Sequence, residues 1–404
     1  MKSIKEVQNL KNKKVLTRVD FNVPIGDGGI IDKKNDWRIK AALPTIQYLL
    51  KKEAKIILIS HFGRPETKLE IASPRLVSLG RRIWNLEYSL KSVAKRLEEL
   101  LDYKIKFVSD CIGNKAKSAV EKMQVGEIIL FENLRFYNEE EKNDKDFAKK
   151  LANVADIYIN DAFSVSHRAH ASVSAITKFL PSYAGLLLEK EIRILSGAID
   201  NPERPATIII GGAKAKTKLL VIKNLLNKFD HIIVGGIVAN VILKAKGIDI
   251  GKSMLDGIDP EEVKKINLTD KKLHIPIDAI GCNTVKKKIE LSAVGDIGDY
   301  KILDIGPESR ELYLNIIKKS KTIIWNGPMG KFENEKFASG TRKIAEAVVQ
   351  SKGYKIIGGG DTITALDQFG YLDKMDYVCT GGGAMLEFLA GEKMPGIEAL
   401  RACK

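Results

Sequence analysis

Short apolar runs alternate with amphipathic stretches along most of the chain, and this alternation limits the possible folds more than any other feature. The strand-like runs of the first half are KKVLTRVDFNVP (13–24), KIILISHFG (55–63), KIKFVSD (104–110), EIILFENL (127–134) and ADIYINDAF (155–163). Helical patterns lie between them, as at 37–52 and 90–101. Strands and helices in this rhythm predict a parallel sheet covered by helices on its faces.

The second half repeats the rhythm after a helical pattern at 181–200. Its strand-like runs, most of which end in glycine, are ATIIIGGA (206–213), HIIVGG (231–236), TIIWNG (322–327), YKIIGGG (354–360) and YVCTGG (377–382). A chain of 404 residues also exceeds the usual size of one core. We therefore predict an α/β protein with two doubly wound parallel-sheet domains, joined by a central helix and separated by an open cleft. The predicted boundaries are 1–180 for the first domain, 181–200 for the hinge helix, 201–390 for the second domain and 391–404 for a C-terminal tail.

Composition and charge narrow the class of protein. The chain is 44% hydrophobic and 29% charged, which is typical of a globular protein. It has no N-terminal secretory signal and no apolar run long enough for a membrane-spanning helix. The four cysteines lack CxxC spacing, which argues against a disulfide framework or a zinc site and favours the cytoplasm. The net charge of +15 suits an anionic ligand, either a nucleic acid or small phosphorylated metabolites, although many of the lysines are typical of solvated helical faces.

Arginine and histidine gather near the predicted strand ends of the first half, where ligands bind in open parallel sheets. Arginine forks bind carboxylate and phosphate oxygens in pairs. Any one of these side chains could instead be a surface salt-bridge partner, but several converging cations repel one another and make sense as a cage for a small, multiply charged anion. The cage predicted from this pattern consists of Arg18, Arg38, Arg64, Arg135, Arg168, His61, His167 and His170.

The second half carries three glycine-rich turns before helical patterns, at 211–220, 358–366 and 380–389. Such turns bring backbone N–H groups and a helix N-terminus close to phosphates. Asp361, which follows three glycines, is a candidate Mg²⁺ ligand, and its alternative role is that of a helix N-cap. GIDIGKS (247–253) is one residue short of a P-loop, and neither GxGxxG after a first strand nor GxSxG occurs.

Nine blocks occur in the order and approximate spacing of phosphoglycerate kinase, and the chain resembles this family from about residue 13 to residue 400. The blocks are RVDFNVP, SHFGRP, LFENLRFY, NDAFSVSHRAHAS, GGAKAKTK, DIGPES, WNGPMGKFEN, GGGDT and CTGGGAMLEF. The resemblance implies a monomeric enzyme that transfers a phosphoryl group between 1,3-bisphosphoglycerate and ADP, giving 3-phosphoglycerate and ATP with Mg²⁺. It also implies that the tail packs back on the first domain.

The resemblance implies roles for individual residues as well. The phosphoglycerate ligands would be Asp20, Phe21, Asn22, Arg38, His61, Phe62, Gly63, Arg64, Arg135, His167, Arg168 and His170. The nucleotide would be held by Gly212, Ala213, Lys214, Lys218, Gly235, Gly236, Asn326, Pro328, Glu333, Gly359, Gly360, Asp361 and Thr362, with Asp361 on the metal. Gly381, Gly382 and Gly383 would reach the phosphate in a closed state. Because the acceptor is an ionised carboxylate, no general base is needed, and Arg38 and Lys214 would cancel charge on the moving group.

The chain departs from the usual family pattern at Trp37, Phe62, the Lys216–Thr217 pair, Ile237 and Ile302. Trp37 bears on the packing of Arg38, and the two isoleucines bear on nucleotide preference.

Two other classes of function remain as alternatives. A nucleic-acid-binding protein is suggested by the charge, but no aromatic stacking pattern accompanies it, so we predict no specific nucleic-acid partner. A catalytically inactive two-domain binding protein is opposed by the presence of Arg38, Lys214 and Asp361.

Overall fold

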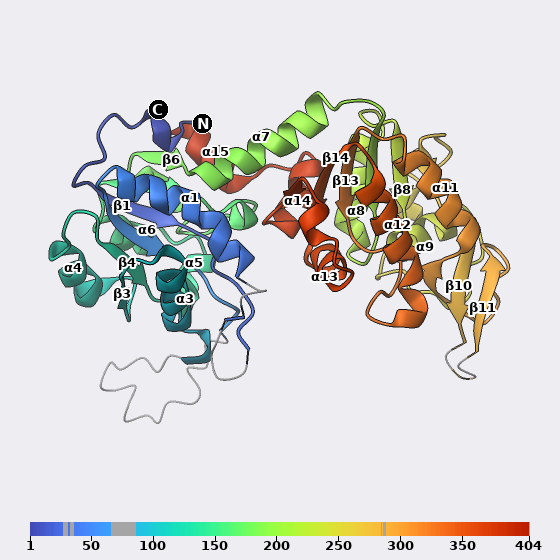
Figure 1. The fold of residues 1–404 in the computed structure, drawn as a ribbon, viewed down its shortest axis with the longest axis horizontal. Coiled ribbons are helices and arrows are strands. Elements are labelled where there is room, and N and C mark those ends of the chain that lie inside the picture. The colour runs from blue at the N-terminus through green and yellow to red at the C-terminus, as the bar shows by residue number, and fades with distance from the viewer. Residues whose placement is uncertain (27–30, 33–35, 66–85, 284, 286–287, 404) are drawn as a thin grey trace. The chain divides into compact units, whose positions relative to one another are not determined.

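A computed structural model describes residues 1–26, 31–32, 36–65, 86–283, 285 and 288–403. The chain forms two compact units (Figure 1): an N-terminal unit of Met1–Ile192 with Lys393–Lys404, and a C-terminal unit of Arg193–Glu392. In the described part of the chain, no helix is long and apolar enough to cross a membrane.

The N-terminal unit is built on a six-stranded sheet in which every pair of neighbours is parallel. Its strands, in spatial order, are β3 (Ile105–Val108), β4 (Ile128–Phe131), β2 (Lys55–Ile59), β1 (Lys14–Arg18), β5 (Ile157–Asn160) and β6 (Ser182–Ala184). Its α-helices are α1 (Trp37–Lys51), α3 (Lys91–Leu101), α4 (Gly113–Glu121), α5 (Asn138–Glu141), α6 (Lys145–Ala152) and α15 (Pro395–Ala402).

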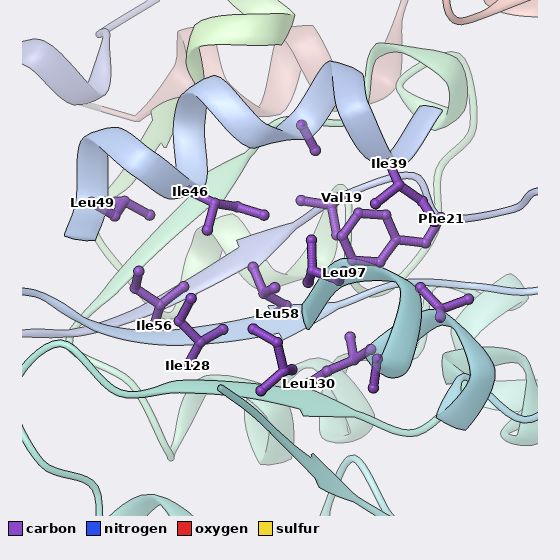
Figure 2. Packing of buried hydrophobic residues seen from close by; sticks show 14 of the residues in the cluster. Val19, Phe21, Ile39, Ile46, Leu49, Ile56, Leu58, Leu97, Ile128 and Leu130 are labelled. Atoms are coloured by element: carbon purple, nitrogen blue, oxygen red, sulfur yellow. The ribbon is translucent and has the colours of Figure 1, made fainter. Parts of the chain in front are cut away.

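Helix α1 covers one face of this sheet because its apolar residues recur at helical spacing. Ile39, Ile46 and Leu49 share one face and are fully buried. They pack over strand residues such as Leu58 and Ile128 in one core cluster (Figure 2). The opposite, polar face of α1 stays in solvent, so burial fixes the orientation of the helix and with it the position of Arg38 at its first turn.

The C-terminal unit repeats this plan with a second six-stranded parallel sheet. Its strands, in spatial order, are β15 (Tyr377–Val378), β14 (Tyr354–Gly358), β13 (Thr322–Asn326), β7 (Ala206–Ile210), β8 (His231–Val234) and β9 (Leu273–His274). Its α-helices are α8 (Ala215–Leu225), α9 (Gly236–Ala245), α10 (Pro260–Val263), α11 (Pro307–Ile317), α12 (Ser339–Gln350), α13 (Gly360–Gln368) and α14 (Gly382–Leu389). A separate antiparallel sheet contains β11 (Ile289–Ala293), β10 (Asp278–Cys282) and β12 (Lys301–Ile305) in that order.

The two predicted parallel-sheet α/β domains are confirmed, and several details differ. The helix predicted at 181–200 is wrong at its start: Ser182–Ala184 pair with β5 as an edge strand, and helix α7 (Leu186–Asp200) begins afterwards. The boundary between the units falls inside α7. The strands are also shorter than the apolar runs that predicted them, because apolar residues such as Phe21 continue past the sheet into the core. The antiparallel sheet was not predicted, because three of the five β11 residues are exposed and its apolar residues alternate with polar ones instead of forming an apolar run.

Candidate active site

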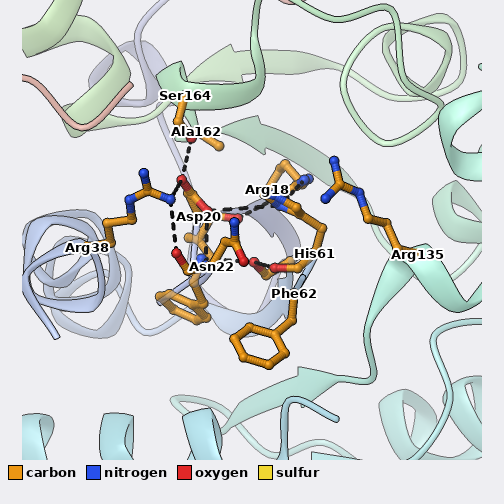
Figure 3. A network of polar contacts seen from close by, with 12 residues as sticks. Arg18, Asp20, Asn22, Arg38, His61, Phe62, Arg135, Ala162 and Ser164 are labelled. Carbon is orange, nitrogen blue, oxygen red and sulfur yellow. Dashed lines mark hydrogen bonds and ion pairs between the residues drawn. The ribbon is translucent and has the colours of Figure 1, made fainter. Parts of the chain in front are cut away.

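Residues just beyond β1 form the centre of a polar cluster in the N-terminal unit. The Asp20 carboxylate accepts hydrogen bonds from the Ser164 hydroxyl at 2.5 Å and from the Asn22 backbone N–H at 3.0 Å. Arg38 Nη1 lies 3.2 Å from the same carboxylate and donates to the Asn22 carbonyl at 2.9 Å. Burial alone would raise the pKa of Asp20, but Arg38, His61 and the Ser164 hydroxyl outweigh burial, and the pKa is lowered. Asp20 is therefore an ionised anchor for Arg38 (Figure 3).

Arg38 is held at one nitrogen and keeps about a quarter of its side chain exposed. Trp37, one of the departures from the family pattern, lies next to it, with the guanidinium carbon 5.2 Å from the centroid of the indole ring. This distance suits a cation–π contact. The tryptophan thus adds a contact to Arg38 that does not consume its hydrogen-bond donors.

Arg18 differs from the other arginines predicted to form the cage, because its guanidinium is enclosed by protein. Its Nε donates to the Ser172 hydroxyl at 2.9 Å, and its Nη2 lies 3.1 Å from His61 Nδ1. Ser172 in turn donates to the buried Glu140 carboxylate at 2.5 Å. Burial lowers the pKa of Arg18, and Glu140 opposes this effect. Arg18 supports the cage from inside rather than offering its charge at the surface.

Arg135 supplies the cage with a buried cation that is incompletely paired. Its Nη1 donates to the Gly63 carbonyl at 2.6 Å, and its Nε lies 3.0 Å from Glu141. Its Nη2 is buried and has no hydrogen-bond partner among the described residues. Burial lowers the pKa of Arg135 to about 10; Glu141 opposes the effect, and the charge of Arg168 adds to it. A buried donor without a partner is costly.

Both histidines of the segment 167–170 are neutral at pH 7. Burial, followed by the charges of Arg18 and Arg135, lowers the pKa of His170 to about 3. Burial and Arg168 lower the pKa of His167 to about 4, and Arg168 Nε donates to His167 Nε2 at 3.1 Å. These imidazoles therefore contribute hydrogen-bonding groups rather than charge. Arg64, the remaining predicted arginine, is exposed and close enough to lower the pKa of Arg135.

Several residues that organise the cage were not singled out from the sequence. Asn133 accepts from the Phe62 N–H at 3.0 Å and donates to the Phe62 carbonyl at 2.7 Å, so it fixes the turn that carries His61 and Gly63. Position 63 requires glycine, because its φ is +57° and a Cβ there would lie 2.4 Å from the Tyr88 ring. Asn133 lies in the block LFENLRFY and Ser164 in the block NDAFSVSHRAHAS. Because both side chains are uncharged, the search for charged anion ligands did not single them out.

In the C-terminal unit, the turn after β7 presents two lysines in different ways. Lys214 is exposed and adopts a left-handed conformation at the N-cap of α8, with φ of 59°. Lys218 is buried and donates to the Gly211 carbonyl at 2.5 Å. Burial lowers the pKa of Lys218 to about 8, with Asp361 opposing and Lys214 adding to the effect. Asp256, which was not predicted, accepts from the Ala215 N–H at 2.9 Å and ties the first turn of α8 to a neighbouring loop.

A cavity of about 500 Å³ lies beside this turn. Its volume is within the range of small-molecule sites. Of the residues predicted to bind nucleotide, it is lined by Gly212, Ala213, Gly236, Pro328, Glu333 and Asp361. Ile237 and Ile302, the two departures expected near the nucleotide, also line it. The predicted residues Lys214, Lys218, Gly235, Asn326, Gly359, Gly360 and Thr362 are outside its lining.

The turns before α13 and α14 approach each other closely. A Cβ on Gly382 would lie 2.8 Å from the Gly359 Cα, and Gly359 has a φ of +97°. Gly381 is the N-cap of α14, and Gly382 and Gly383 are its first residues. Thr362 accepts from the Gly327 N–H at 2.6 Å, and Asn326 Nδ2 is buried without a hydrogen-bond partner in the described structure.

Asp361 lies in the first turn of α13, but the N-cap is Gly359, so the alternative role of Asp361 as an N-cap is wrong. Its exposed carboxylate lines the cavity, close enough to Lys218 to affect the pKa of that lysine. The described residues contain no group of three or more His, Cys, Asp or Glu side chains able to hold a metal. One carboxylate facing a cavity fits Mg²⁺, which usually takes one or two protein carboxylates together with nucleotide phosphates.

Taken together, two helix-covered parallel sheets, one with arginines and histidines gathered beyond its strand ends and the other with glycine turns and a cavity, are typical of a two-domain α/β enzyme that handles phosphorylated ligands. A family model described as phosphoglycerate kinase matches residues 4–392. Phosphoglycerate kinase from Coprothermobacter proteolyticus is 43% identical over 99% of this chain and 98% of its own length. The enzyme of the same name from Dictyoglomus turgidum is 45% identical over 98% of this chain and 97% of its own length.

Solved structures give the same result. The structure of phosphoglycerate kinase from Coxiella burnetii has a TM-score of 0.82 at 38% identity and covers 100% of this chain and 99% of its own. That of phosphoglycerate kinase from Pyrococcus horikoshii has a TM-score of 0.81 at 32% identity, with 99% and 98% covered. The chain belongs to the phosphoglycerate kinase family, as its sequence blocks predicted.

Proposed function

We propose that this protein transfers a phosphoryl group reversibly between 1,3-bisphosphoglycerate and ADP, giving 3-phosphoglycerate and ATP with Mg²⁺, as a cytoplasmic monomer. The observation that carries the proposal is the buried Arg135 nitrogen without a partner among the described residues, in a cluster of cations that repel one another. Such a cluster is unfavourable unless an anion neutralises it. A phosphorylated carboxylate offers several oxygens to such donors.

Arg38 is the residue to which we assign charge cancellation in the N-terminal unit. Asp20 and the Asn22 carbonyl hold one guanidinium nitrogen, which fixes the position of the fork while part of it stays exposed. Fixed donors stabilise developing charge without reorganising during the reaction. We exclude Arg18 from ligand binding, since its guanidinium is enclosed.

In the C-terminal unit, we assign the nucleotide to the cavity and its phosphates to the glycine turns before α8, α13 and α14. Asp361 would hold Mg²⁺, which supplies neutralisation of phosphate charge when bound. Lys214 would contact the transferred group, while the buried Lys218 fixes the turn through Gly211. No general base is required, because the acceptor carboxylate is already ionised at neutral pH. Since the two ligands belong to different units, the reaction requires domain closure, and we propose that α7 serves as the hinge.

The test is a coupled assay of ATP consumption that depends on 3-phosphoglycerate and Mg²⁺. Arg38→Ala should lower kcat by roughly 10²–10³-fold, the usual cost of losing one fixed donor to developing charge, and leave KM for ATP within about twofold. Arg401→Ala, on an exposed arginine paired with Glu398, is the matched control and should keep wild-type activity. Absence of wild-type turnover, or an Arg38→Ala variant with unchanged kcat, would contradict the proposal.

A further inference from the structure

Asn240 brings a buried, unused hydrogen-bond acceptor to the wall of the cavity. The side chain belongs to α9, lines the cavity and is only 3% exposed. Its Nδ2 donates to the Met254 carbonyl at 3.4 Å, which sets the orientation of the amide. Its Oδ1 is buried and finds no hydrogen-bond partner in the described part of the chain. Since buried acceptors are nearly always paired, this oxygen requires a donor that the described residues do not supply.

Asn240 is one of the residues that line the cavity, so a ligand bound there is the donor that we consider. Along α9, Gly236, Asn240 and Leu243 all line the cavity, as residues at this spacing share one helix face. Met254, Met329 and Ile302 contribute apolar side chains to the same lining. A single amide oxygen in a mostly apolar wall can fix the orientation of a flat, apolar ligand group and discriminate between similar ligands.

The position of Asn240 along α9 indicates which part of a nucleotide it meets. The helix begins at Gly236, which adjoins the glycine turn after β7: the Ile237 N–H donates to the Gly212 carbonyl at 3.1 Å. This end carries the glycine turn assigned to phosphate. Asn240 lies four residues further along the helix, roughly 6 Å from that end at 1.5 Å per residue. The space beside it is therefore beyond the phosphates, in the nucleoside part of the cavity.

We infer that Asn240 reads the nucleobase, with Oδ1 accepting a hydrogen bond from the exocyclic amino group of adenine. The inference rests on the proposed nucleotide site and adds to it a residue that determines base preference. An adenine base offers an N–H donor at carbon 6, whereas a base that lacks this group leaves Oδ1 buried and unpaired. Discrimination then arises mainly from the cost of the unpaired acceptor.

The experiment compares binding of ADP and of purine riboside 5′-diphosphate, which differs from ADP only by loss of the 6-amino group. Calorimetry on the full chain should give wild-type protein a preference for ADP of roughly tenfold in Kd, as expected for one hydrogen bond to an otherwise unpaired buried acceptor. Asn240→Leu, of similar size without the acceptor, should bring this ratio to about one. Asn224→Leu is the matched control, because the Asn224 amide bonds the Leu389 carbonyl and is not part of the cavity lining.

The outcomes separate this inference from the proposed function. An ADP preference that persists in Asn240→Leu, or that disappears equally in Asn224→Leu, overturns the inference while turnover with 3-phosphoglycerate stays intact. If Asn240→Leu instead removes a preference for ADP over 2′-deoxy-ADP, Oδ1 reads the ribose and the assignment to the base is wrong. Absence of ADP binding to the wild-type protein contradicts the nucleotide site itself. Thermal unfolding without nucleotide verifies that Asn240→Leu is folded.

Discussion

At the scale of single residues, burial decides what each charged group in the cage can do. Arg18 and Arg38 are both arginines near the end of β1 in the fold, yet one is enclosed and the other is a quarter exposed. The sequence shows the same residue type in both positions. Only the packing of Ser172 and His61 around Arg18 distinguishes a supporting cation from one available to a ligand.

The lowered pKa of His170 can be tested through the pH dependence of protein stability. Its pKa is about 3 in the folded protein, lowered by burial and by Arg18 and Arg135, and about 6.5 in an unfolded chain. The unfolded chain therefore takes up the proton first as pH falls. Stability from the neutral imidazole is complete above about pH 6.5 and is lost as pH decreases toward the folded pKa. Between pH 7 and pH 5, wild type should lose about 2 kcal/mol more of its free energy of unfolding than His170→Gln does. Urea unfolding at both pH values measures this, and equal losses would show that the pKa of His170 is not lowered in the folded protein.

At the scale of elements, the start of α7 is fixed by side chains from two other segments. Asp161 Oδ1 accepts from the Leu187 N–H at 2.9 Å and from the Leu188 N–H at 3.3 Å. Thr45 of α1 accepts from the Leu186 N–H at 3.0 Å. Gly185 precedes the helix because a Cβ there would lie 2.1 Å from Asp161 Oδ1. These contacts explain why the helix predicted from residue 181 begins later.

The cap at Asp161 is testable by two substitutions. Asp161→Ala removes the acceptor and should lower the free energy of unfolding by about 1–2 kcal/mol, as for other lost N-caps. Asp161→Asn keeps an acceptor oxygen and should cost less. Urea unfolding gives the two values, and hydrogen exchange at Leu187 and Leu188 should be faster only in the alanine variant. Equal losses in the two variants would mean that the negative charge, not the acceptor, holds the helix.

At the scale of the whole molecule, both ends of the chain belong to the N-terminal unit. In α15, Ile397 and Leu400 are buried, and the Gly396 N–H donates to the Ser166 carbonyl at 2.8 Å. A Cβ on Gly396 would lie 2.5 Å from Val173, so the helix packs directly on the segment that carries Arg168. The last residues of the chain therefore support the cage.

Deletion of residues 393–404 should destabilise the N-terminal unit selectively. The deletion removes the buried side chains Ile397 and Leu400 and exposes the residues that they cover. At roughly 1.5–3 kcal/mol for each side chain, the free energy of unfolding should fall by about 3 kcal/mol or more. Hydrogen exchange by mass spectrometry should show faster exchange in β5 and β6, with the strands of the C-terminal unit unchanged. Ile397→Ala is the milder companion variant and should produce part of the effect. A loss of protection spread evenly over both units would show that they do not unfold independently.

Much of the fold follows from sequence because a parallel sheet buried on both faces needs apolar strands, as β2 and β4 have. The amphipathic pattern of α1 likewise fixes its orientation. The antiparallel sheet was not predicted from the sequence, because β11 alternates exposed and half-buried residues and therefore contains no continuous apolar run. Strand ends were overextended, since apolar residues such as Phe21 continue past the sheet into the core.

The sequence by itself determined the α/β class and the family, and it identified arginine, histidine and glycine near strand ends, because periodicity and motifs are local properties of a chain. The tertiary structure decided which of these groups face a ligand. It enclosed Arg18, neutralised His167 and His170, and left Arg135 Nη2 and Asn240 Oδ1 buried without partners among the described residues. Burial and hydrogen-bond partners arise from segments far apart in the chain, so no local pattern can specify them.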